Sequence, residues 1–151
     1  MTLTNYDIDK IENVIKLPTF RGCFSKDELP HVKKANECMI INMQDDKDGD
    51  GSHWICLYKH ERNGTFYFDS FGLEPPIDII SYCKNKYHLV TDKQIQPIKS
   101  NKCGWYCLYV LDMLTSGESV HNIMSTFSTT DLNKNDELIK RYFREYNLKV
   151  K

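Results

Sequence analysis

The chain has 151 residues, a length that fits one domain with its own hydrophobic core. Its 20 basic and 21 acidic residues give a net charge of −1, which excludes the strong positive field typical of nucleic-acid-binding proteins. No apolar run approaches the about 20 residues of a membrane-spanning helix, and the first residues lack the features of a signal peptide. We therefore expect a single soluble domain, residues 1–151, inside the cell, with no membrane partner.

Apolar periodicity predicts alternating helices and strands along the chain. Helical spacing over residues 7–16 ends before Pro18, and a short strand follows at residues 38–42. Two aromatic runs, residues 53–59 and 65–71, predict an antiparallel hairpin. Further expected elements are a helix over residues 76–87, a strand over 88–98, a helix over 103–116 and an amphipathic helix over 135–147.

The cysteine pattern and the acidic segment argue against a metal site. The six cysteines are scattered without a Cys-x-x-Cys pair, which makes a structural zinc site improbable and predicts mostly buried thiols in a reducing compartment. Residues 45–52 resemble a calcium loop only faintly, because Cys56 falls where the bidentate glutamate would be needed. We expect no metal and no cofactor.

The sequence "SNKCGWYCLYVLDML" places a thiol at the start of an apolar helix. With Asn101 as the expected N-cap, Cys103 lies in the first turn, where unpaired backbone N–H groups and the helix dipole favour a thiolate. Gly104 removes a Cβ that would crowd a substrate backbone near the sulfur. Cys107, one turn later, is expected to be a packing residue. On this stretch alone, a simply buried Cys103 explains the pattern as well as a nucleophile does.

A nucleophilic thiol needs a base and an orienting group. Among five histidines, His53 begins an apolar strand directly after a polar loop, and Asp69 interrupts an aromatic strand, where a carboxylate needs a partner. A tight Asn63-Gly64 turn would put the two on opposite faces, about 17 Å apart along the strands. A wider connection over residues 59–63 would oppose them directly, with Cβ atoms about 5 Å apart.

Three stretches, "GSHWICLY", "FYFDSFG" and "QPIKSNKCGWYCLYVL", resemble the adenain-like cysteine proteases of adenoviruses, virophages, large DNA viruses and Polinton transposons. That family shares a catalytic core with SUMO-processing proteases. Its pattern is His-Trp, an acidic residue shortly before Phe-Gly, and a glutamine several residues ahead of Cys-Gly. The resemblance covers nearly all of the chain. It implies an α+β fold: a circularly permuted papain-like cysteine protease core with a small central mixed β-sheet flanked by helices.

By this resemblance the chain is a thiol protease with a His-Asp-Cys triad. Cys103 corresponds to the nucleophile, His53 to the general base and Asp69 to the orienting carboxylate. Gln96 would donate a side-chain N–H to the oxyanion, beside the backbone N–H of Cys103. Gln94 is the competing glutamine, but Gln96 has the family's spacing to the cysteine.

The resemblance also implies a substrate class. Trp54 and Gly104 would bind substrate, with Trp54 either a wall of a narrow cleft or a core residue. The expected substrates are viral capsid and core precursor polypeptides, cleaved after Gly-x or Gly-Gly sites during virion maturation. We expect a monomer in the virion and in the cytoplasm or nucleus of the host cell. Two alternatives stay open: a protease that deconjugates SUMO or ubiquitin-like proteins, and a non-catalytic virion interaction module.

The order of the catalytic residue types along the chain and the net charge bear on the expected reaction and on its activators. The order His, Asp, Cys differs from the Cys, His, Asp order of transglutaminase-like acyltransferases. Adenovirus-type enzymes are stimulated by DNA and by a viral peptide, and the near-neutral charge here gives no support for DNA. An activating peptide stays open as a partner. Cys83 lies in the general region where a disulfide to such a peptide would form, although burial in a helix explains it better.

Overall fold

The computed structural model describes residues 2–44 and 53–151, so the faint calcium-loop pattern of residues 45–52 lies outside the described residues. A mixed sheet of five strands forms the centre of the molecule, in the order β1-β2-β3-β4-β5. The strands are β1 (Phe20–Ser25), β2 (Glu37–Asn42), β3 (Trp54–His60), β4 (Gly64–Phe68) and β5 (His88–Leu89). The three middle strands are antiparallel, and each edge strand pairs with its neighbour in parallel.

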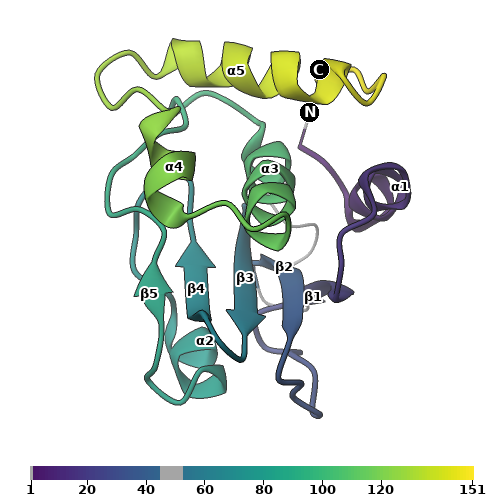
Figure 1. Ribbon diagram of the computed structural model, residues 1–151, viewed down its shortest axis with the longest axis vertical. Helices are drawn as coiled ribbons and strands as arrows, with labels where there is room; N and C mark the ends of the chain where they lie inside the picture. Colours follow the sequence, from purple (N-terminus) through teal and green to yellow (C-terminus); the bar gives the residue numbers. More distant parts are fainter. Residues whose placement is uncertain (1, 45–52) are drawn as a thin grey trace.

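Helices cover both faces of this sheet (Figure 1). They are α1 (Asn5–Ile15), α2 (Ile77–Tyr82), α3 (Cys103–Thr115), α4 (Val120–Ser125) and α5 (Asn133–Arg144). Helices α1 and α3 pack on one face, α2 packs on the other, and α5 lies across the end of α3 (Figure 1). Within residues 2–44 and 53–151, no helix has the length and apolar character needed to cross a bilayer.

Strand β2 is buried along its whole length because its two sets of side chains enter two different cores. Cys38 and Ile40 face the core shared with α1 and α3, whereas Met39 and Ile41 face the core shared with α2. A strand covered on both faces carries apolar residues in an unbroken run instead of alternating with polar ones. This arrangement explains the sequence "CMIIN".

Helix α3 is the central helix of the larger core. Every residue from Cys103 to Asp112 is buried, and the helix is apolar all round, as expected for a helix surrounded by protein. It contacts β3, α1, α4 and α5, and the rings of Trp105 and Phe143 lie 4.8 Å apart where α3 meets α5. Its first residue, Cys103, is therefore held on a rigid element.

Several expected elements differ from the observed ones. Strand β1 and helix α4 were not expected: β1 is only partly buried and contains Gly22 at φ +119°, and α4 has six residues. The helix expected over residues 76–87 ends at Tyr82, because Lys84 and Asn85 have left-handed backbone conformations. The strand expected over 88–98 has two residues, since a turn closed by Thr91 follows it.

Burial predicts where truncation destabilises the fold. Ile40→Ala should lower the free energy of unfolding by about 2–5 kcal/mol, because it leaves a cavity between the sheet and α3. Ile77→Ala is the control, since Ile77 is 72% exposed and its loss should change stability by less than about 0.5 kcal/mol. Urea denaturation measures both, and equal losses would contradict this assignment of the core.

Candidate active site

The ends of β3 and β4 bring His53 and Asp69 together. Their connection consists of residues 61–63, with His60 paired to Gly64, which rules out the tight Asn63-Gly64 turn. The expectation that His53 and Asp69 lie directly opposite is wrong by two residues, because this register places Asp69 level with Ile55. A shift of two residues keeps the same face of the sheet. Nε2 of His53 lies 2.8 Å from Oδ1 of Asp69.

The turn after Asp69 holds the imidazole from a second side. Oδ1 of Asp69, a residue 1% exposed, also accepts the backbone N–H of Phe71 at 2.9 Å. The centroid of the Phe71 ring lies 4.9 Å from that of the His53 ring, so the two rings are in contact. Gly72 is required here, since its φ is +74° and a Cβ would lie 2.6 Å from the carbonyl carbon of Lys93. The Phe-Gly motif thus fixes both the carboxylate and the ring.

Cys103 is the first residue of α3 and is buried beside His53. Its sulfur accepts the backbone N–H of Trp54 at 3.4 Å, and its side chain is near enough to the His53 ring to contribute to the raised pKa of that ring. Since Nε2 of His53 faces Asp69, Nδ1 is the ring nitrogen left for the thiol. The expected N-cap is wrong: Lys102 occupies that position without a side-chain cap, and the Asn101 side chain instead accepts from Lys102 Nζ.

His53 is polarised by these two neighbours. Burial disfavours the charged ring, but the hydrogen bond and charge of Asp69 and the neighbouring Cys103 side chain outweigh it and raise the pKa of His53 to about 9. At neutral pH the ring is therefore protonated. A protonated imidazole between a carboxylate and a thiol can hold the thiol as a thiolate and later return a proton.

Gln96 is buried and its amide is fixed at both ends. Nε2 donates to the carbonyl of Ser100 at 2.9 Å, and Oε1 accepts the hydroxyl of Ser70, which fixes the orientation of the amide. Gln94 uses its side chain to donate to the Gln96 carbonyl. Sequence reasoning missed Ser70, although it stands directly after Asp69 in the "FDSFG" motif.

Trp54 and Gly104 lie beside the N-terminal segment that precedes α1. Trp54 is 4% exposed, and its indole N–H donates to the carbonyl of Leu3 at 2.8 Å. A Cβ on Gly104 would lie 3.1 Å from Cδ1 of Leu3 and 3.4 Å from Cδ1 of Trp54. The space that we expected to admit a substrate backbone is thus bounded by Leu3, which the sequence patterns did not single out.

Two other cysteines that the sequence analysis considered, Cys107 and Cys83, differ from Cys103 in their surroundings. Cys107 is fully buried, donates to the Trp54 carbonyl, and burial raises the pKa of its thiol. Cys83 is partly buried, and burial raises the pKa of its thiol to about 11. Across residues 2–44 and 53–151, the structure contains no cluster of three potential metal ligands.

Comparison of the structure with solved structures identifies its fold. The chain matches two crystal structures of the ASFV pS273R protease. The selenomethionine form is 20% identical over 99% of this chain and 69% of that chain, with a TM-score of 0.66. The second is 22% identical over 99% and 68%, also with a TM-score of 0.66.

This is the fold of a viral protease. The expected α+β class, a mixed sheet flanked by helices, is confirmed. Neither a protein-family model nor a curated protein matches the sequence.

The geometry predicts an unusual titration of His53. Its ring should titrate near pH 9 in NMR spectra, and Asp69→Asn should lower that pKa by at least about one unit because the carboxylate charge is lost. The folded-state pKa exceeds the ordinary value of 6.5, so the stabilisation is complete below pH 6.5 and is lost as the pH rises to about 9. Asp78→Asn, on α2, is the control. Titration near 6.5 in the wild type would contradict the arrangement.

Proposed function

We propose that the chain is a cysteine endopeptidase in which Cys103 is the nucleophile, His53 the base and Asp69 the orienting residue. The observation that carries this proposal is the hydrogen bond between His53 and the buried Asp69 carboxylate, with the Cys103 thiol beside the same ring at the start of an uncapped helix. The fold likeness to a viral protease supports the same reaction class.

The steps follow from the positions of the groups. The Cys103 thiolate attacks the peptide carbonyl, forming an S–C bond, while the carbonyl π electrons move to the oxygen. The oxyanion accepts the second N–H of Gln96 Nε2 and the backbone N–H of Cys103. His53 then gives its Nδ1 proton to the leaving amine as the C–N bond breaks. Water, deprotonated by His53, attacks the thioester and releases the acid and the thiol.

The proposed substrates are viral structural precursors cleaved after small residues of the Gly-x or Gly-Gly type, in the virion or the infected cell. Leu3, Trp54 and Gly104 lie close together beside Cys103, and this crowding favours residues without large side chains. The fold likeness to a viral protease supports a viral precursor. Deconjugation of a ubiquitin-like protein would use the same residues, and comparing precursor peptides with SUMO fusions tests it.

Substitution of three buried residues tests the division of labour. Cys103→Ala should abolish turnover with the fold intact, because it removes the nucleophile and little volume. Gln96→Ala should slow peptide cleavage by about 10²–10³ while Cys103 still reacts with iodoacetamide, because one oxyanion donor is lost. Cys107→Ala should keep activity and lose about 1 kcal/mol of stability. If Cys107→Ala abolished turnover and Cys103→Ala did not, the nucleophile would be misassigned.

The N-terminal segment gives a specificity prediction. Leu3→Ala should widen the site beside Gly104, so the enzyme should accept larger side chains just before the scissile bond, measured as kcat/KM over a peptide library. Leu73→Ala is the control, because Leu73 is 63% exposed. A library profile unchanged in Leu3→Ala, or a wild type that prefers bulky residues, would remove Leu3 from the substrate cleft.

A further inference from the structure

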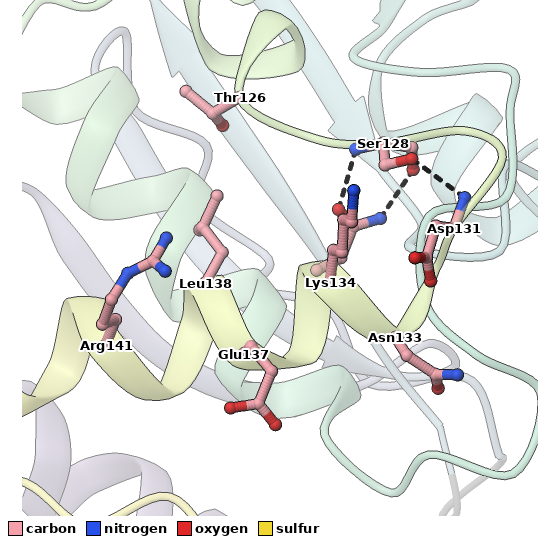
Figure 2. A pocket seen from close by; sticks show the side chains of 9 residues that line it. Thr126, Ser128, Asp131, Asn133, Lys134, Glu137, Leu138 and Arg141 are labelled. Carbon is pink, nitrogen blue, oxygen red and sulfur yellow. Dashed lines mark hydrogen bonds between the residues drawn. The ribbon is translucent and has the colours of Figure 1, made fainter.

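The first turn of α5 contacts the segment that carries Gln96, although the two are about 40 residues apart in the sequence. Asn135 is 1% exposed, and its Nδ2 donates to the carbonyls of Ile95 and Ser128, both at 2.7 Å. Its Oδ1 accepts the backbone N–H of Ser128 at 2.8 Å. Figure 2 shows Ser128 and its hydrogen bonds above the start of α5. Asn135 thus fixes the backbone directly before Gln96.

Asp136 joins the other end of the same segment to α3. Its Oδ1 accepts the hydroxyl of Tyr106 at 2.7 Å and the hydroxyl of Ser100 at 3.2 Å. Tyr106 lies one turn after Cys103, and the carbonyl of Ser100 holds the Gln96 amide. Burial and the neighbouring carboxylate raise the pKa of Tyr106, so its hydroxyl remains a donor.

We propose that Asp136, assisted by Asn135, is a positioning residue of the oxyanion site. Its carboxylate connects the loop that orients the Gln96 amide with the helix that begins at Cys103. The hydrogen bonds of Asp136 Oδ1 thereby position both proposed oxyanion donors, the Gln96 amide and the backbone N–H of Cys103. This inference rests on the proposed function, and Asp136 acts through Ser100 and Tyr106 without touching the substrate.

The chain contains a matched control for this role. Asp112, on α3, is buried, whereas Asp136 is half-buried. The Oδ2 of Asp112 accepts the hydroxyl of Tyr142 on α5 and that of Tyr146, two residues beyond the end of α5. It therefore joins α3 to α5 by the same chemistry as Asp136. It does so near the C-terminal end of α3, far from Cys103. Loss of Asp112 should weaken the helix contact without affecting the Gln96 segment.

The experiment compares Asp136→Ala, Asp136→Asn and Asp112→Ala. Asp136→Ala should lower kcat about 10- to 100-fold with little change in KM, because misplacing a donor by about 1 Å costs that much. Alkylation of Cys103 by iodoacetamide should stay unchanged. Asp136→Asn keeps an acceptor oxygen and should restore kcat to within about threefold of wild type. Asp112→Ala should melt earlier but keep kcat.

A second readout is independent of proteolysis. The side-chain amide resonances of Gln96 should shift in Asp136→Ala and not in Asp112→Ala, since only the first variant releases Ser100. If the wild type cleaved no peptide, the proposed protease function would be wrong. The Gln96 resonances would still test whether Asp136 positions the Gln96 amide. Unshifted Gln96 resonances in Asp136→Ala, or equal losses of kcat in both alanine variants, would overturn the inference.

Discussion

The hydrogen bond between His53 and Asp69 is the constraint on which the arrangement of the site depends. It closes the open end of the β3–β4 hairpin, beyond the last paired residues, and it fixes which ring nitrogen faces the thiol. Phe71 supports it by donating its backbone N–H to the same carboxylate and by placing its ring against His53, and Gly72 allows the turn that puts Phe71 there. The carboxylate of Asp69 raises the His53 pKa, and the turn that follows it holds this carboxylate in place, so one short segment sets both geometry and charge.

Much of the fold could be predicted where periodicity and burial agree. The amphipathic stripe of α1 and the apolar run of α3 were visible in the sequence, and both helices lie close to the expected bounds. The elements that were missed or overextended depend on tertiary contacts. Strand β1 pairs with β2 across a bulge near Gly22, and the segment after Leu89 is held by side-chain turns instead of a ladder.

In the site, too, some residues could be predicted from the sequence and others could not. His53, Asp69, Cys103 and Gln96 were found by motif. The structure brings the first three together and bonds Gln96 to Ser70, the residue after Asp69. Their supports could not be found that way, because Ser70 and the first turn of α5 act through hydrogen bonds between distant segments. The exact hairpin register could not be predicted either. A connection of three residues and one of five both keep the side chains of His53 and Asp69 on one face of the sheet.

The long separations within the site have a consequence for how the protein matures. Trp54 meets Cys103 across 49 positions, and Asn135 meets Ile95 across 40, so the site has high contact order and its parts cannot assemble locally. Folding therefore has to bring β3, α3 and α5 together before the segment that carries Gln96 is fixed, and contacts of this kind form more slowly than local ones.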